Sequence, residues 1–195
     1  MTDGRPVLGV IGSGAGGVEQ LRAELVEPAQ QRGWNVAVTL TPTAASWLEE
    51  SGELTKLEAA VELPVRVQPR MPHEKSRHPP VACYVVAPAS ANTVAKLALG
   101  LMDNQALTTV CEAIGGQVVP VVVFPRVNAA HARQPAWRGH LDALRAAGVH
   151  LIYGEDVWPL AEPRQAPPRR PLPWTAILDA AERAVTSTNA TTRQS

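Results

Sequence analysis

The chain contains few cysteines, which argues against a disulfide-rich protein and against a cysteine-based metal site. Its two cysteines, Cys83 and Cys111, stand in apolar segments and belong to no CxxC motif and no Cys/His cluster with metal-ligand spacing. We therefore expect two buried free thiols in a reducing compartment, and we predict no metal site.

The chain also lacks an excess of charge and any long hydrophobic run. Its 18 basic and 18 acidic residues balance to a formal net charge of zero, so bulk electrostatics favours neither nucleic acid nor an anionic membrane as a partner. No segment reaches the ~18 apolar residues of a membrane span, and the first residues lack the features of a signal peptide. We expect a cytoplasmic protein.

Apolar runs alternate with helical patterns along the 195 residues. We expect strands at Val7–Ile11, Asn35–Leu40, Cys83–Val86, Val118–Phe124 and Val149–Tyr153, and a minor strand at Val65–Val67. Helices are expected at Val18–Arg32, Ala44–Glu50, Val94–Leu101, Gln105–Ile114, Trp137–Ala147 and Trp174–Thr186. This alternation predicts an α/β fold, a three-layer αβα sandwich with a Rossmann-like (flavodoxin-like) parallel sheet.

One domain is expected over residues 1–186, because a chain of this length leaves little room for a second. Residues 187–195 are polar and are predicted to form a disordered tail. Two proline-rich segments, 67–80 and 159–173, interrupt the pattern and are predicted loops that cover a site.

The turn after the first strand contains Gly12, Ser13 and Gly14 within a GxGxxG pattern. Such a turn can place a phosphate on the amides of a helix N-terminus. A dinucleotide fold expects an acidic residue after the second strand, whereas Thr41 and Thr43 occupy that place here. Two hydroxyls favour a mononucleotide phosphate. The alternative is a glycine turn that only allows close helix packing.

A polar segment follows the strand at Cys83–Val86, where ligands bind in open α/β sheets. It reads Pro88-Ala89-Ser90-Ala91-Asn92-Thr93, and Asp103-Asn104 follow one helix later. Small residues allow close approach, and Ser90, Asn92 and Thr93 offer donors and acceptors beside free helix amides. Ser90 or Asn92 also fits an ordinary N-cap of the expected helix at Val94–Leu101, and Asp103-Asn104 fit an N-cap of the expected helix at Gln105–Ile114.

With Ala95-Lys96-Leu97-Ala98 and Gly100, this segment resembles the PASANT segment of the homo-oligomeric flavin-containing cysteine decarboxylases. That family includes phosphopantothenoylcysteine decarboxylases and decarboxylases of lantibiotic precursors, and the similarity in pattern extends from about Val7 to Ile152. The resemblance implies FMN as cofactor, with Ser13, Thr41 and Thr43 at its phosphate. It also implies trimers or larger homo-oligomers, with Asp103 and Asn104 beside the flavin or a neighbouring subunit.

The segment Pro125–Pro135 resembles the substrate clamp of the same family, a Pro-x-Met-Asn-x-x-Met-Trp pattern followed by a proline. Pro125, Asn128 and Pro135 match, whereas the two methionine positions hold Val127 and His131, and Ala132 replaces the tryptophan. The match implies that Asn128 contacts the substrate's cysteine carboxylate and the reacting group. Arg126 can add a charge-assisted contact, and His131 lies in the same segment. In isolation, Asn128 also fits a turn asparagine and Arg126 an exposed loop residue.

The family's catalytic histidine lies in a His-(Ile/Val)-x-Leu sequence that is absent here. His73 lies one residue from the ungapped position and is the predicted base, because a neutral imidazole accepts a proton near pH 7. His78 and His131 are alternatives, and His73 also fits a solvated loop residue.

The resemblance implies oxidation of a cysteine at its β-carbon by FMN, followed by loss of the carboxylate as carbon dioxide, which leaves an enethiolate. Residues 154–173 contain no cysteine to assist a later reduction, so the enethiol is the expected product. The substrate would be a peptide or small molecule with a cysteine carboxylate. Two other functions remain open: an FMN-binding regulatory or redox protein without decarboxylase activity, and a flavin prenyltransferase, whose signature loops are not evident.

Overall fold

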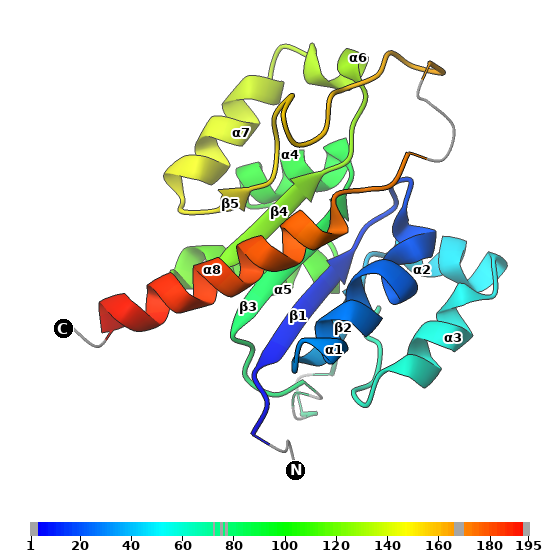
Figure 1. Cartoon of the computed structure of the whole chain (residues 1–195), viewed down its shortest axis with the longest axis vertical. Helices are drawn as coiled ribbons and strands as arrows, with labels where there is room; N and C mark the ends of the chain where they lie inside the picture. The colour runs from blue at the N-terminus through cyan, green and yellow to red at the C-terminus, as the bar shows by residue number, and fades with distance from the viewer. Residues whose placement is uncertain (1–3, 72, 75, 77, 166–169, 193–195) are drawn as a thin grey trace.

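The structure is a computed structural model that describes residues 4–71, 73–74, 76, 78–165 and 170–192. Its centre is a five-stranded sheet in the order β2-β1-β3-β4-β5, in which every neighbouring pair is parallel (Figure 1). The strands are β1 (Val7–Gly12), β2 (Asn35–Leu40), β3 (Cys83–Ala89), β4 (Val121–Pro125) and β5 (His150–Leu151). This strand order is the flavodoxin-like one, and the predicted α/β sandwich is confirmed.

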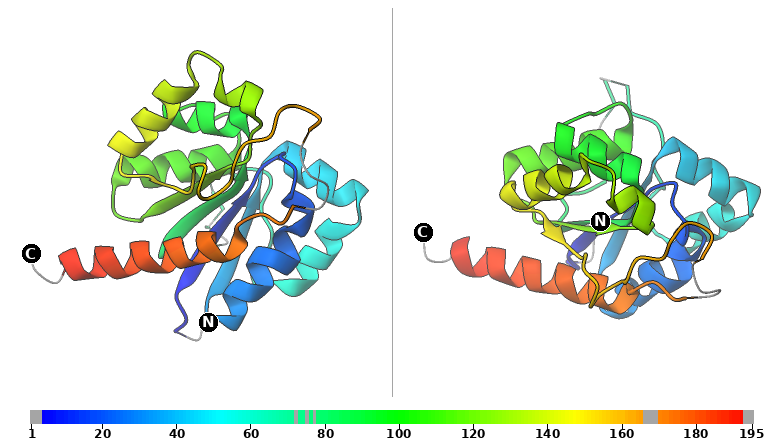
Figure 2. Two further views of the ribbon diagram at one scale, coloured as in Figure 1. Left: turned by 45° about the horizontal axis from the view of Figure 1, so that its top comes forward. Right: turned by 90° about the horizontal axis from the view of Figure 1, so that it is seen from above.

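Helices cover both faces of the sheet, so β1 and β2 are buried along their whole length. One face carries η1 (Val18–Gln20), η2 (Arg22–Val26), α1 (Glu27–Gln31), α2 (Pro42–Glu50), α3 (Glu53–Ala60) and α8 (Trp174–Thr192). The other carries α4 (Ala91–Leu99), α5 (Gln105–Gly116) and α7 (Trp137–Ala146). Alternate strand residues point into each core: Phe124 packs with the first set and Val123 with the second. Figure 2 shows the three layers from the side and from above.

Several elements differ in length from the predicted ones. The expected helix at Val18–Arg32 is divided into η1, η2 and α1, and α3 was not predicted. The minor strand reduces to one bridge between Thr39 and Arg66. The fourth strand begins at Val121 rather than at Val118, whose side chain is 76% exposed.

The predicted disordered tail is wrong as far as Thr192, because α8 continues through it. The hydroxyls of Thr186, Ser187 and Thr188 each donate to the carbonyl four residues earlier, at 2.9, 3.0 and 3.0 Å. The hydroxyl groups are therefore satisfied within the helix itself, although the polar composition of this segment disfavours a helix. Residues 193–195 of the predicted tail lie outside the described residues.

Within the described residues, no helix combines the length and apolar character needed to cross a membrane.

Candidate functional site

The turns that follow β1, β2 and β3 meet at the carboxyl edge of the sheet, where the strand order reverses between β1 and β3. Ser13 holds two of these turns together. Its hydroxyl donates to the Pro88 carbonyl at 2.8 Å and accepts from the Ser90 amide at 2.8 Å. The Thr41 amide donates to the Gly12 carbonyl at 2.9 Å, which links the turn after β2 to the same frame. Ligands bind at this position in open α/β sheets.

A cavity of about 570 Å³ opens between these turns and the first turns of α4 and α5. We call it the β1–β3 cavity. Its volume lies within the ordinary range of cofactor sites. It brings together nine of the predicted site residues: Gly14, Thr41, Thr43, Ser90, Asn92, Thr93, Asp103, Asn104 and His131.

Three of the polar side chains of the β1–β3 cavity also cap helices. Thr41 caps α2 with its oxygen 3.3 Å from the Ala44 amide, Ser90 caps α4 and Asn104 caps α5. Each of these oxygens already accepts one main-chain N–H group, and the Ser90 and Thr93 hydroxyls bond to each other at 3.0 Å. The Thr41 hydroxyl hydrogen and one of the two hydroxyl hydrogens of Ser90 and Thr93 therefore remain for a ligand. The N-cap interpretation and the ligand interpretation are therefore compatible, and the set of donors suits an anionic group.

Charge at the rim of the β1–β3 cavity is balanced by an ion pair. Lys96 on α4 donates to the Asp103 carboxylate, which also accepts from the Asn104 side-chain amide at 3.0 Å. The hydrogen bond from Lys96 is the largest cause that lowers the pKa of Asp103. Asp103 is therefore an anion at neutral pH. Lys96 lines the cavity beside it, which the sequence analysis left without a role.

Four residues predicted to bind the cofactor lie behind the wall of this cavity. Ser13 is 0% exposed, and the main-chain bonds described above occupy its hydroxyl. Gly12, Pro88 and Ala89 are also buried. The Ala89 carbonyl accepts from the Arg126 amide at 2.8 Å, which attaches the segment after β4 to the same frame. These residues position the turns, and their side chains do not line the cavity.

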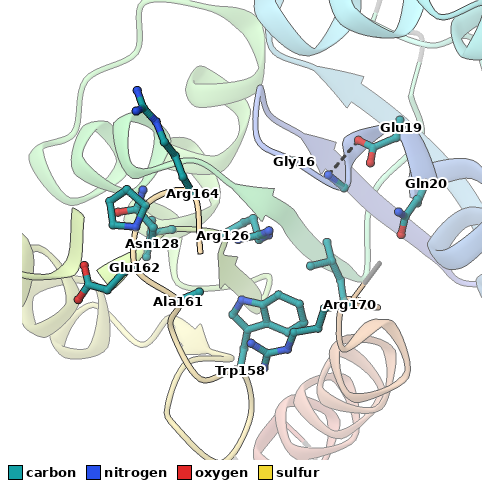
Figure 3. Close-up of a pocket in the computed structure, with 14 residues that line it drawn as sticks. Gly16, Glu19, Gln20, Arg126, Asn128, Trp158, Ala161, Glu162, Arg164 and Arg170 are labelled. Carbon is teal, nitrogen blue, oxygen red and sulfur yellow. Dashed lines mark hydrogen bonds between the residues drawn. The ribbon is translucent and has the colours of Figure 1, made fainter. Parts of the chain in front are cut away.

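A second cavity, of about 370 Å³, lies at the same sheet edge but between η1, the end of β4 and the segment before α8 (Figure 3). We call it the arginine cavity because Arg126, Arg164 and Arg170 line it. Asn128 lines it too, so the structure separates the predicted substrate residues: Arg126 and Asn128 are here, whereas His131 lines the β1–β3 cavity. Described residues of the proline-rich segment, at 161–164, 170 and 172, contribute to this wall.

The three candidate histidines lie in three different places. The His131 amide donates to the Asn128 side-chain oxygen at 2.9 Å, so Asn128 caps the short helix α6 (Ala129–Ala132). His73 is exposed and does not line either cavity. His78 contacts the Pro64 carbonyl through Nε2 at 2.8 Å, and burial lowers its pKa. His131 is thus the predicted histidine that the structure brings to the β1–β3 cavity.

Trp158 and Arg170 at the arginine cavity were not identified from the sequence. Trp158 directly precedes the proline-rich segment 159–173 and Arg170 lies within it, and only the folded chain brings the two residues beside Arg126. Local sequence carries no signal for such a contact.

A flavodoxin-like parallel sheet with a polar, donor-rich cavity at its switch point defines an α/β protein that binds a mononucleotide cofactor. The model of the family described as Flavoprotein matches residues 3–182. The chain therefore belongs to the Flavoprotein family.

Solved structures give the same result for the fold. The FMN-dependent cysteine decarboxylase TvaF from thioviridamide biosynthesis is 25% identical, with a TM-score of 0.68 over 94% of this chain and 99% of that one. The cypemycin decarboxylase CypD is 18% identical, with a TM-score of 0.66 over 93% of this chain and 94% of that one. A cysteine/cysteine sulfinic acid decarboxylase from an unknown prokaryotic organism is 36% identical over 69 residues, which are 35% of this chain and 18% of the relative. The match thus spans less than a fifth of that curated relative.

Proposed function

We propose that this flavoprotein binds FMN in the β1–β3 cavity and catalyses the oxidative decarboxylation of a cysteine-containing peptide or small molecule to an enethiol. The observation that carries the proposal is the gathering of nine predicted residues around one cavity at the switch point of the sheet. Membership of the Flavoprotein family and the likeness to TvaF support the same function.

The donor set of the cavity fits FMN. The hydroxyls of Thr41 and Thr43 and the Thr43 amide would hold the phosphate, because Pro42 has no N–H and the Ala44 and Ala45 amides already donate to Thr41. Ser90, Asn92 and Thr93 at the start of α4 would contact the polar edge of the ring, with Asp103 and Asn104 at the rim. When bound, FMN supplies a two-electron acceptor for the oxidation of the cysteine side chain.

The chain's own residues would bind and orient the cysteine. Asn128 uses its side-chain oxygen as a helix cap, so its NH₂ group is the part that can donate to the substrate carboxylate. His131 lines the β1–β3 cavity and is the base candidate that the geometry favours, since it can accept the thiol proton there. His73 is exposed and would act only in a site that a neighbouring copy completes.

Release of the enethiol, without its reduction, follows from the sequence of residues 154–173, which holds no cysteine. We also propose a homo-oligomer, such as a trimer, supported by the exposed apolar side chains of Leu99, Leu101 and Met102 next to the cavity-forming helices. The two free cysteines favour a cytoplasmic location.

An absorption spectrum of the purified protein, followed by anaerobic mixing with peptides ending in cysteine, tests the proposal. We expect a yellow protein whose flavin bleaches as carbon dioxide is released. His131→Ala should slow bleaching by about 10²- to 10⁴-fold without loss of bound flavin, as expected for removal of a general base. His73→Ala gives the same loss if His73 is the base, and His140→Ala on α7 is the matched control.

Three outcomes separate the possibilities. A colourless protein that FMN does not reconstitute would refute the cofactor assignment. A yellow protein that no cysteine-terminated substrate bleaches would instead favour the flavin-binding protein without decarboxylase activity. Full activity in both variants and in His78→Ala would refute a histidine base while leaving the reaction intact.

A further inference from the structure

The arginine cavity is built by three segments that are distant in sequence. Gly16 and Gly17 precede η1, Arg126 follows β4 directly, and Trp158 and Arg170 belong to the segment before α8. Figure 3 shows the Arg126 and Arg170 side chains beside Trp158, with Asn128 and Glu162 on the opposite wall. The cavity is separate from the β1–β3 cavity, and the proposed flavin and base account for none of these basic groups.

Trp158 holds both arginine side chains in place. The guanidinium carbon of Arg170 lies 3.5 Å from the centre of the indole ring, and that of Arg126 lies 5.1 Å from it. Trp158 itself is 7% exposed, and its indole packs edge-on against Phe124, with the two ring centres 6.3 Å apart. Stacking of this kind orients a guanidinium without using its N–H groups. Arg170 donates one of them to the Pro159 carbonyl at 2.5 Å.

Positive charge in the cavity exceeds the negative charge available to neutralise it. Glu162 is paired with Arg133 through two hydrogen bonds of 2.6 and 2.9 Å. Glu19 accepts from the Gly17 amide at 2.9 Å and its charge attracts Arg126, so among the described lining residues one carboxylate is left to balance three arginines. Among the described residues, Arg126, Arg164 and Arg170 form no ion pair with a carboxylate.

Arg126 is the least satisfied of the three. Its Nε is buried and has no hydrogen-bond partner among the described residues. Burial, and then the nearby charge of Arg170, lower the pKa of Arg126. Arg126 as a whole is half-buried, so the cost falls on its buried Nε, and an anion placed against the guanidinium relieves that cost.

We propose that the arginine cavity is a specificity subsite that binds an oxyanion, carboxylate or phosphate, carried by the substrate upstream of its reacting cysteine. The inference rests on the proposed function, because it assigns part of that substrate. One short segment connects the two cavities: Arg126 and Asn128 line this one, and His131 lines the other. A substrate whose cysteine lies near Asn128 therefore has its preceding residues within reach of Arg126 and Arg170.

Cysteine-terminated heptapeptides test the subsite. One position at a time upstream of the cysteine carries glutamate or phosphoserine, and the matched peptides carry glutamine or serine. We expect one position at which an oxyanion lowers KM by about tenfold to a hundredfold with little change in kcat, as charge-assisted hydrogen bonds to arginine would do. Preference for glutamate identifies a carboxylate ligand, and preference for phosphoserine identifies a phosphate.

Arginine variants test which groups recognise the anion. Arg126→Gln and Arg170→Gln should each reduce the advantage of the anionic peptide to less than about threefold, and Arg170→Gln should leave the KM of the neutral peptide unchanged. Arg126→Lys, which keeps the charge but loses the fork of donors, should retain part of it. Arg138→Gln on α7, where the side chain is 93% exposed, removes the same charge elsewhere and should change nothing.

The subsite and the reaction can fail separately. Peptides ending in serine do not react, and their binding is followed by tryptophan fluorescence. If no peptide is decarboxylated but anionic serine peptides bind in a way that needs Arg126, the subsite stands and the reaction does not. If peptides are decarboxylated with the same KM whatever their charge, the subsite is refuted. If Arg126→Gln impairs neutral and anionic peptides equally, Arg126 contacts the cysteine's own carboxylate, and the subsite is likewise refuted.

Discussion

At the scale of single residues, the β1–β3 cavity depends on how closely the turns after β1 and β2 approach each other. Gly14 has no side chain, and a Cβ atom at this position would lie 2.6 Å from Thr43 Cγ2 and 3.0 Å from Thr43 Cβ. Thr43 is a short, branched residue that cannot swing away, so one of the two turns must shift. A glycine is therefore required by the wall of the site itself.

Gly14→Ala should weaken FMN binding by about tenfold or more, because overpacking of this kind costs about 1 to 3 kcal/mol. Titration of the flavin-free protein with FMN, followed by quenching of flavin fluorescence, measures the effect. Gly16→Ala in the same turn is the matched control, since a Cβ atom there meets nothing within 4 Å. Equal affinities for the two variants would show that the phosphate-binding turn lies elsewhere.

At the scale of elements, α8 anchors the segment that forms one wall of the arginine cavity. Ile177 and Leu178 are 0% and 1% exposed and pack in the core that α8 shares with β3 and β4. Leu172, just before the helix, belongs to the same core and lines the cavity. Packing of α8 on the sheet thereby positions the proline-rich segment 159–173.

Ile177→Ala should lower the free energy of unfolding by about 2 to 5 kcal/mol, through lost burial and the space left behind. Thr186→Ala in the same helix should change it by less than about 0.5 kcal/mol, because only an exposed hydroxyl bond to Glu182 is lost. Urea unfolding followed by circular dichroism compares the two. If Ile177→Ala also lowers the free energy of unfolding by less than about 0.5 kcal/mol, α8 contributes little to the core.

At the scale of the whole molecule, stability should fall in alkali because of a buried thiol. Burial raises the pKa of the Cys83 thiol from 9.0 to about 12. Above pH 9 the unfolded chain has lost this proton while the native state still holds it, so rising pH favours unfolding. Between pH 8 and pH 10, this group should remove about 1.4 kcal/mol of stability.

Urea unfolding of the native protein and of Cys83→Ala at both pH values isolates that contribution. The native protein should lose about 1.4 kcal/mol more than the variant over this range. Cys111→Ala should remove a smaller part of the pH dependence, since burial also raises the pKa of Cys111 but that residue is less buried. An identical pH dependence with and without Cys83 would contradict a buried, protonated thiol.

Local sequence predicted the sheet well because each strand is a short apolar run between turn residues. Asn35–Leu40 was predicted with its observed bounds, and the turns after β1, β2 and β3 carry the residues that line the β1–β3 cavity. Element ends were harder to predict. Val118 is apolar yet exposed, and the hydroxyl residues at 186–188 continue α8 through bonds to its own carbonyls.

The sequence by itself determined the order of strands and helices and the position of the polar turns, since these depend on neighbouring residues. Tertiary structure alone decided which of those residues line a cavity. Ser13 became a buried link between two turns, because the folded turns bring the Pro88 carbonyl and the Ser90 amide to its hydroxyl. Arg126 lies before the crossover from β4 to β5, whereas Trp158 and Arg170 lie after it, and contacts between such distant segments depend on packing that no local pattern encodes.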